Sequence, residues 1–419
     1  MGSERKYRLA IDMGTSQIST RLFSCKSNEK LSITQPNYLL QYGIELVSLV
    51  DFVQKSPSNL QILTTTIRKQ IDSQIKLLCI KNTISENNIS QAILIGNPVL
   101  HHIFLSHDVT GFKYPPYRPS FLDSLWVKGH EVQLYAIQDV PIFIPRIIDA
   151  FVGSDALCLS HLAKLLGYDT QLLLDIGTNT EIILKKHDDY FVTSAPSGPA
   201  FEGMSLDCGM MAEQGAITNI ELDEIFNPHL IVIGSGQPMG ICGTGVVSAI
   251  AELLKHSIIN ENGSISRELA IPQIEERNSI LSYTLVSASD ASIGTRIYIS
   301  QPDIRMVQQS KAAIFGAIKT LLDAANVPQE EIEYLFLTGS FGSNIDITDA
   351  TTIGLFPSLD KANHEQAKHG ALEGAINLSC MDDSEKELSE LCTRIKYVPL
   401  ENNSVFDSYY LTGHRFAKL

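Results

Sequence analysis

The stretch of sequence that decides the fold occurs twice in this chain of 419 residues, as LAIDMGTS over residues 9–16 and as LLLDIGTN over residues 172–179. Each copy has an apolar strand, an aspartate, a turn built around glycine, and then a β-branched strand. This pattern predicts a hairpin that gathers polar groups at its turn. Two related hairpins so far apart predict two similar α/β subdomains, because a solenoid would repeat every ~20–50 residues.

Strands and helices alternate along the rest of the chain, which predicts the α/β fold class. We expect a helix from Ile304 to Ala325, with Asp303 as its N-cap and the Val327-Pro328 pair as its stop signal. Its apolar side would be formed by Val307, Ile314, Ile318, Leu321 and Ala325. A second helix is expected from Thr244 to His256, opened by a glycine-rich stretch. A short buried strand at 335–337 leads into a further glycine-rich run.

Charge and hydropathy exclude several classes of protein. Lys and Arg number 32 against 47 Asp and Glu, so the net charge is 32 − 47 = −15. This balance argues against binding to nucleic acid, which needs a basic face. No apolar run approaches the ~20 residues of a membrane span, and the polar start of the chain lacks the apolar stretch of a signal peptide. We therefore expect a cytoplasmic protein without a membrane partner.

The cysteines indicate neither a disulfide framework nor an iron–sulfur cluster. Their number is odd, their spacing is wide, and no C-x-x-C pair occurs. We expect scattered, buried thiols. The seven are Cys25, Cys79, Cys158, Cys208, Cys242, Cys380 and Cys392.

The paired turns carry the chemistry. Glycine in a tight turn lets backbone N–H groups approach a phosphate closely, and the neighbouring hydroxyl groups add donors. Asp12 and Asp175 precede these turns, where a carboxylate would repel a bare anion. A magnesium ion held largely through its waters resolves that conflict. One Asp-x-Gly-Thr is a weak signal, but two in the same setting predict that the turns clamp the phosphates of a nucleotide.

Other glycine-rich stretches differ from the standard phosphate-binding motifs. There is no G-x-x-x-x-G-K-[ST] motif, and Gly234-Ser235-Gly236 is followed by Gly240, one residue too far for G-x-G-x-x-G. The loop 240–245 either presents N–H groups to an anion at the start of a helix or is a close packing turn between strand and helix. The run 339–342 suits a flat base and ribose lying against the backbone.

Taken together, these motifs resemble the acetate and sugar kinase, heat-shock chaperone and actin superfamily, and within it the ATP-dependent reductive activators of corrinoid proteins. The resemblance runs from about Leu9 to Phe416, and its most specific block is SGPAFEG at 197–203. Further blocks lie at 96–98, 100–102, 114–117, 151–155, 209–210, 215–217, 240–245, 308–314, 353–355 and 370–375.

The resemblance implies duplicated ribonuclease-H-like subdomains that form a bilobal actin-like ATPase with a nucleotide cleft between the lobes. The first lobe would occupy residues 1–165, with a large insertion at about 36–150. The second lobe would occupy 166–345, and the segment 346–419 would return to the first.

Members of that family hydrolyse ATP and help to reduce an inactive corrinoid protein from Co(II) to Co(I). The resemblance therefore implies ATP and magnesium as ligands, a corrinoid protein as partner, and a homodimer. Electrons usually come through an attached ferredoxin-like iron–sulfur domain. Here the first phosphate loop starts at residue 12, so we expect no iron–sulfur cluster in this chain. The chain would be either a short homologue or a portion cut from a longer protein. In both cases we expect the electrons to come from a separate donor. Thr180 and His369 stand where the family usually has glycine and asparagine.

The family's functional residues carry over onto matching positions. Asp12 and Asp175 would organise magnesium through its waters, and Asp155 and Glu202 are candidates to orient or deprotonate the attacking water. Either of the last two could equally cap a helix or form a structural ion pair. The candidate nucleotide-binding residues are Gly14, Thr15, Ser16, Gly177, Thr178, Asn179, Gly243, Gly339, Ser340, Phe341 and Gly342.

Two other functions fit the same motifs. A small-molecule kinase of the superfamily would transfer phosphate to an acceptor hydroxyl or carboxylate instead of to water. A nucleotide-regulated interaction module would bind ATP tightly without turning it over. The intact pair of aspartates argues against an interaction module that does not turn ATP over.

Overall fold

Both predicted hairpins are present. In the computed structural model, which describes residues 6–26, 30–234, 236–359 and 361–417, β1 (Tyr7–Met13) pairs antiparallel with β2 (Gln17–Phe23). Likewise, β7 (Thr170–Ile176) pairs antiparallel with β8 (Thr180–Lys186). Each aspartate lies one residue before the end of its first strand, so both turns begin immediately after it. Ser235 of the glycine-rich stretch 234–236 and the extreme ends of the predicted domains lie outside the described residues.

The chain divides into two units. The first comprises residues 1–169, 187–192 and 369–397, and the second comprises 170–186, 193–368 and 398–419. Helices and strands alternate in both, which confirms the α/β class. No helix in the described part of the chain is long and apolar enough to cross a membrane.

The first unit is built on a mixed sheet with the strand order β3-β2-β1-β4-β6-β5, in which β1 and β4 run parallel. Parallel strands are buried on both faces, and all side chains from Leu9 to Ile11 are buried. Its other strands are β3 (Lys30–Pro36), β4 (Ile89–Gly96), β5 (Leu125–Lys128) and β6 (Pro141–Ile144). In addition, β18 (Ile395–Tyr397) pairs parallel with residues 190–192 of β9 (Asp189–Ala195).

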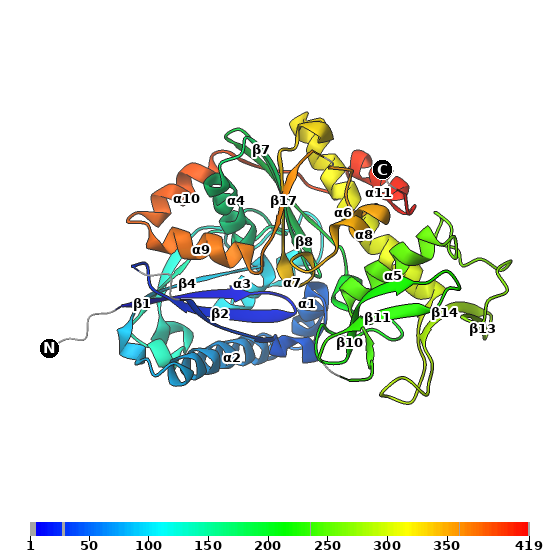
Figure 1. Cartoon of the computed structure of the whole chain (residues 1–419). Helices are drawn as coiled ribbons and strands as arrows, with labels where there is room; N and C mark the ends of the chain where they lie inside the picture. The colour runs from blue at the N-terminus through cyan, green and yellow to red at the C-terminus, as the bar shows by residue number, and fades with distance from the viewer. Residues whose placement is uncertain (1–5, 27–29, 235, 360, 418–419) are drawn as a thin grey trace. The chain divides into compact units, whose positions relative to one another are not determined.

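Helices cover both faces of this sheet. Figure 1 shows α2 and α9 on opposite sides of β1 and β2, with α2 against β2 and α9 against β1 and β4. The helices are α1 (Leu46–Lys55), α2 (Asn59–Lys81), α3 (Pro98–Leu105), α4 (Ser154–Leu166), α9 (Gly370–Cys380) and α10 (Ser384–Cys392). Short 3-10 helices in this unit are η1 (Tyr38–Gln41), η2 (Glu86–Asn88), η3 (Thr110–Phe112), η4 (Gly129–Val132) and η5 (Tyr135–Ile137).

One cysteine pair contradicts the expectation of scattered thiols. Cys25 and Cys380 form a disulfide between positions 355 residues apart in the sequence, with Cα atoms 5.7 Å apart. The pairing arises because α9 returns to the first unit and ends beside the turn after β2. Glu373 on the same helix is ion-paired with Arg21 and, at 2.6 Å, with Lys30. Sequence spacing could not predict a contact made by such a distant segment.

The second unit contains the strand order β17-β16-β7-β8, with β7, β16 and β17 parallel. Two smaller sheets have the orders β11-β10-β12 and β13-β14-β15. The strands are β10 (Ala216–Leu222), β11 (Pro228–Val232), β12 (Gly240–Ile241), β13 (Ile274–Arg277), β14 (Ile280–Val286), β15 (Ile297–Ser300), β16 (Tyr334–Thr338) and β17 (Asn363–Gln366).

Its two long helices lie close to their predicted bounds. α5 (Gly243–Lys255) and α6 (Gln301–Ala325) are present, and the apolar face predicted for α6 is buried. The predicted N-cap of α6 is wrong: Ser300 is the cap, and Asp303 completes a capping box three residues later. The remaining helices are η6 (Pro199–Glu202), η7 (Gln329–Glu331), α7 (Gly339–Gly342), α8 (Ile347–Thr352) and α11 (Ser404–Gly413).

A glycine permits α4 and α9 to cross in contact. A Cβ atom added at Gly374 would lie 2.0 Å from the carbonyl oxygen of Cys158. We expect Gly374→Ala to lower the free energy of unfolding by about 1–3 kcal/mol, because the two helices would have to separate. The loss should appear although alanine is the better helix former by ~1 kcal/mol.

Urea unfolding followed by circular dichroism measures this change. Gly236→Ala is the matched control, because an added Cβ meets nothing within 4 Å there. The control should stay within about 0.5 kcal/mol of the wild type. Equal stability of the two variants would contradict the packing argument.

Candidate functional site

The turn after Asp175 is held by a hydroxyl group and a backbone amide from another segment of the second unit. The amide of Gly177 donates to the carbonyl of Asn179 over 3.1 Å, which closes the turn. The Ser197 hydroxyl donates to the carbonyl oxygen of Gly177 at 3.0 Å, and the amide of Gly198 donates to that of Thr178 at 2.9 Å. Because the carbonyl groups are used in this way, the turn is braced from its carbonyl side. Ser197 belongs to the distinctive block 197–203, but its part in bracing the turn was not predicted.

Thr180, where the resemblance leads one to expect glycine, is accommodated by the same serine. The Thr180 side chain is fully buried, and its hydroxyl lies 2.8 Å from that of Ser197. The extra side chain therefore replaces empty space with a hydrogen bond. The substitution joins β8 to the residue that braces the turn.

The Glu202 carboxylate joins two of the predicted motifs. At the end of η6 it accepts a hydrogen bond from the Thr178 hydroxyl at 2.5 Å and another from the Ser340 hydroxyl at 3.3 Å. Thr178 belongs to the phosphate turn and Ser340 to the glycine run 339–342. The structure thus brings together three candidate residues that are far apart in the sequence.

Gly339 lies in close contact with Asp175 and Ile176. Gly339 directly follows β16, which is the parallel neighbour of β7, with Thr338 paired opposite Asp175. A Cβ at Gly339 would lie 2.5 Å from Asp175 Oδ1, and the residue has a φ of +90°. The nearest oxygens to that position are the Asp175 carboxylate and the carbonyl oxygen of Ile176, also at 2.5 Å. Carboxylate and carbonyl oxygens are among the ligands that magnesium accepts. The donor set therefore fits a hydrated magnesium ion carried in with a nucleotide.

Phe341 and Gly243 serve packing in this unit. The Phe341 ring is buried and stacks on Phe201 with ring centroids 4.7 Å apart. A Cβ at Gly243 would lie 1.7 Å from the carbonyl oxygen of Phe201. Of the two interpretations of the loop 240–245, this contact favours a close packing turn. In the run 339–342, Ser340 is exposed, whereas Phe341 and Gly342 are buried.

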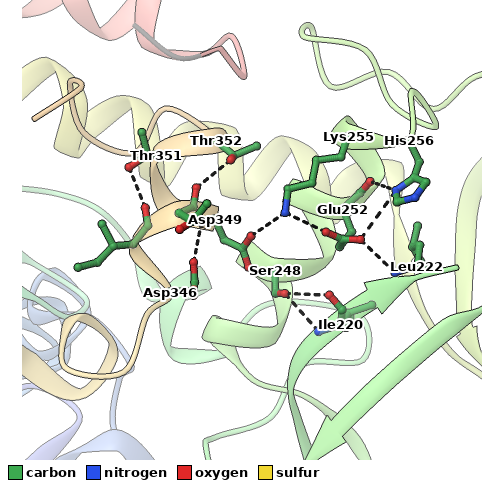
Figure 2. A network of polar contacts seen from close by, with 12 residues as sticks. Ile220, Leu222, Ser248, Glu252, Lys255, His256, Asp346, Asp349, Thr351 and Thr352 are labelled. Atoms are coloured by element: carbon green, nitrogen blue, oxygen red, sulfur yellow. Dashed lines mark hydrogen bonds and ion pairs between the residues drawn. The ribbon is translucent and has the colours of Figure 1, made fainter. Parts of the chain in front are cut away.

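A polar network fixes α5 against α8, the helix that follows the glycine run (Figure 2). The Lys255 ammonium lies 2.9 Å from Glu252 Oε1 and 3.3 Å from Asp349 Oδ1. The amide of Leu222 donates to Glu252 at 3.0 Å, which adds β10 to the network. Burial raises the pKa of Asp349, and the Ser248 hydroxyl and the Lys255 ammonium act against this shift. The network holds the elements around the glycine run in place.

In the first unit, the turn formed by Gly14, Thr15 and Ser16 is held by Asn37, which is not among the candidate residues predicted from the sequence. The Asn37 side chain is buried and donates to the carbonyl oxygen of Gly14 at 2.9 Å. The backbone amide of Asn37 donates to the carbonyl oxygen of Ser16 at 2.8 Å. The one signal in the sequence is an asparagine placed to cap the short helix η1.

The strand that carries Asp12 also has a parallel neighbour, β4, whose last residue is a glycine. Gly96 pairs with Met13, and a Cβ there would lie 2.7 Å from the carbonyl oxygen of Met13. The amide of Gly96 donates to the Ser154 hydroxyl at 3.1 Å, which in turn lies 2.8 Å from His101 Nε2. Burial lowers the pKa of His101 to about 3, so this imidazole is neutral. The histidine and serine fix the start of α4.

Asp155, the next residue on α4, has a perturbed carboxyl group. Burial raises the pKa of Asp155 to about 6. Burial also raises the pKa of Cys158, and the negative charges of Asp155 and Asp12 raise it further. Both carboxylates therefore act on the same side of α4. A carboxyl group that titrates near neutral pH is suited to take a proton from water.

The raised pKa of Asp155 makes stability depend on pH. The folded protein keeps a proton that the unfolded chain releases, so stability is lost as the pH rises from about 4 through about 6. Asp155→Asn removes this loss and should be more stable than the wild type at pH 7.5 by about 1–3 kcal/mol. At pH 4 the two proteins should differ little.

Urea unfolding without magnesium or nucleotide, repeated from pH 4 to 7.5, measures the difference. Asp139→Asn, at an exposed aspartate of the same unit, should keep the wild-type pH dependence. Parallel pH profiles for wild type and Asp155→Asn would sink the argument.

Comparison with known proteins shows similarity over nearly the whole chain. The chain is 28% identical over 425 residues to the corrinoid activation enzyme RamQ of Eubacterium limosum, and the match covers 98% of this chain and 70% of RamQ. It is 24% identical over 445 residues to the [Co(II) methylated amine-specific corrinoid protein] reductase of Methanosarcina barkeri, covering 97% of this chain and 76% of that protein.

A solved structure gives the same result. The reductive activator for corrinoid,iron-sulfur protein superposes with a TM-score of 0.88 at 28% identity, over 99% of this chain and 67% of that one. The actin-like ATPase fold expected from the sequence is confirmed.

Two family models match consecutive parts of the chain. Residues 7–165 match the RACo middle region, and residues 169–418 match the C-terminal domain of RACo, the ASKHA domain. The suspected resemblance is therefore confirmed, and the chain belongs to the RACo family of reductive activators.

Proposed function

We propose that this chain is an ATP hydrolase that activates a corrinoid protein by assisting the reduction of its cobalt from Co(II) to Co(I). The observation that carries the proposal is the cluster in which the Glu202 carboxylate binds the hydroxyl groups of Thr178 and Ser340. It joins a phosphate turn to the glycine run proposed to border adenosine, which is what a nucleotide site requires. Relatives named for corrinoid activation and reduction supply the partner.

The two turns would bind the phosphates of MgATP. Backbone N–H groups and hydroxyl groups are the donors in both, from Gly14 to Ser16 and from Gly177 to Asn179. The braces on the carbonyl groups of Gly14, Ser16, Gly177 and Thr178 leave those oxygens engaged, so they do not repel the anion. Asp12 and Asp175 would hold magnesium through its waters, and the metal supplies positive charge against the phosphate oxygens.

The environments of the two candidate carboxylates separate their roles. Asp155 has a pKa raised to about 6 by burial, which makes it the better base for the attacking water. Glu202 is engaged with two hydroxyl groups, one in the phosphate turn, so we assign it to positioning those hydroxyl groups. Asp155 would accept a proton from the attacking water. The oxygen of that water would attack the γ-phosphorus of ATP, which releases ADP and phosphate.

Hydrolysis would drive activation through conformational preference. ATP can shift the chain between states only by as much as its affinity for them differs. A state favoured by ATP that binds the corrinoid protein would weaken the cobalt ligation of the resting Co(II) form. One electron from a ferredoxin-like iron–sulfur donor then converts Co(II) to Co(I). We place this activity in the cytoplasm. Residues 1–165 and 166–345 would form the two ATPase lobes.

An activation assay tests the proposal. The chain is mixed with MgATP, titanium(III) citrate as electron donor, and a purified methylated amine-specific corrinoid protein or corrinoid,iron-sulfur protein in the Co(II) state. Co(I) should accumulate, by its visible absorption, only when both the chain and ATP are present. Equal accumulation without either one would refute the proposal. Labelled γ-phosphate transferred to an added acceptor instead of to water would favour a kinase.

Steady-state kinetics of two variants test the division of roles. Asp155→Asn should lower kcat by roughly 10²- to 10⁴-fold with little change in the KM for ATP, because it removes the base. Glu202→Gln should raise the KM by roughly ten- to a hundredfold, because hydrogen bonds to a charged group contribute about 1.5–3 kcal/mol. The wild-type rate should rise with pH through about 6 and then level off.

Asp139→Asn is the control and should match the wild type in both constants. A wild-type rate that stays flat between pH 5 and 7, or a kcat of Asp155→Asn equal to that of the wild type, would exclude Asp155 as the base. A KM effect in Asp155→Asn with a kcat effect in Glu202→Gln would reverse the assignment.

A further inference from the structure

A large cavity lies in the second unit, outside the residues assigned to the nucleotide. Its volume is about 920 Å³, within the range of ligand pockets. One face of the β13-β14-β15 sheet forms its floor, where Glu275, Ser282 and Ser300 make one row across the three strands. The opposite face carries buried residues such as Tyr283 and Ile299. The sheet therefore packs on one side and presents a polar, hollowed face on the other.

The floor of the cavity is charge-compensated. The Arg296 guanidinium donates to the hydroxyl groups of Ser282 at 3.1 Å and Thr284 at 3.0 Å. It lies 4.1 Å from the centre of the Tyr298 ring and 3.6 Å from Glu275. Glu275 also pairs with the cavity's second arginine, Arg277, at 2.8 Å, and Asp207 adds a further carboxylate to the lining. A floor with this balance does not attract a polyanion, so a second nucleotide or a nucleic acid is a poor occupant.

The rim is apolar and exposed. Met239, Ile280 and Ile293 line the cavity with exposed fractions of 44%, 44% and 49%. Large apolar side chains grouped around a hollow mark interaction sites on protein surfaces, and tyrosine, methionine and arginine are enriched where proteins bind proteins. A polypeptide loop would satisfy such a cavity, because an apolar side chain fits the rim and its backbone amides and carbonyls fit the hydroxyl groups of the floor.

The wall of the cavity is directly connected to the candidate nucleotide site. Cys208 and Gly209 line the cavity, only a few residues after Glu202. The intervening segment is closed on itself, since a Cβ at Gly203 would lie 2.0 Å from the carbonyl oxygen of Met210. The wall is also hydrogen-bonded to β12. The amide of Ile241 donates to the carbonyl oxygen of Cys208, and the amide of Met210 donates to the carbonyl oxygen of Ile241, each at 2.9 Å. β12 leads to Gly243, which packs on Phe201 beside Glu202.

We infer that this cavity is the docking site for a loop of the corrinoid protein, and that the segment 203–210 couples docking to the nucleotide. The inference rests on the proposed function, because that function supplies the partner. A displacement of Glu202 on ATP binding or hydrolysis moves the start of a closed loop whose other end forms the cavity wall. The cavity then offers different affinities for the partner before and after hydrolysis.

Charge introduced at the rim tests the inference. Met239→Glu and Ile293→Glu place a carboxylate in the apolar rim without touching the residues assigned to ATP. In the presence of MgATP, each should weaken binding of a Co(II) corrinoid protein, the methylated amine-specific or the corrinoid,iron-sulfur protein, at least tenfold by calorimetry. Ile231→Glu is the matched control: it lies on β11 of the same unit, is 62% exposed, and does not line the cavity. It should bind within twofold of the wild type.

The outcomes separate this inference from the proposed function. Basal ATP hydrolysis and the thermal midpoint should be unchanged in all three variants. If the wild type and both rim variants bind the corrinoid protein equally, the docking site is elsewhere and the proposed function stands. If the wild type binds neither corrinoid protein, the proposed function and the docking site fall together.

A cysteine footprint gives a second readout without a rim substitution. Cys208 is half-buried in the cavity wall, whereas Cys79, Cys158 and Cys242 are buried. In a Cys392→Ser background, the corrinoid protein should slow maleimide labelling of Cys208 at least fivefold, with Cys208→Ser as the blank. Full protection by MgATP alone, or protection that grows with the concentration of the chain itself, would overturn the inference in favour of loop closure or self-association.

Discussion

Each unit depends on one contact, in which a strand bearing an aspartate lies against a parallel neighbour that ends in a glycine or runs directly into one. In the first unit a Cβ at Gly96 would lie 2.7 Å from the carbonyl oxygen of Met13, and in the second a Cβ at Gly339 would lie 2.5 Å from that of Ile176. Both carbonyl groups belong to the residue after the aspartate. Since no side chain can occupy this space, the two strand ends and their polar groups stay close together.

The turns that follow the two aspartate-bearing strands are held through their backbone carbonyl groups by residues from other segments. Asn37 holds the first turn by its carbonyl groups, and Ser197 holds the second in the same way. This arrangement matters for anion binding, because a carbonyl oxygen pointing at a phosphate would repel it. The two braces come from unrelated segments, so the duplicated geometry is maintained by different means in each unit.

Burial gives similar carboxyl groups different chemistry in this protein. Asp155 lies where burial raises its pKa, whereas Glu202 is committed to two hydroxyl groups that belong to separate motifs. Asp349 is also buried but has Lys255 beside it, and its place in the network is structural. Carboxylate identity therefore says little until the neighbouring groups are known.

Much of the fold could be predicted from the sequence because its signals are local. The repeated aspartate turns predicted both hairpins, and the apolar period of residues 304–325 predicted the buried face of α6. The error at the N-cap of α6 has a local cause, since Ser300 and Asp303 are both good capping residues and only the backbone shows which one begins the helix. The resemblance over the whole chain then predicted the actin-like fold and the family.

The sequence by itself determined the strand–turn–strand units, the α/β class, and the kinds of side chain available to a nucleotide. Only the tertiary structure decided which of them meet: Glu202 with Thr178 and Ser340, Asn37 with Gly14, and Cys25 with Cys380. The physical reason is that strand and helix periodicity depend on neighbours a few residues away. Side-chain contacts between distant segments depend instead on register, helix crossing and the space left by glycine, which exist only once the chain has packed.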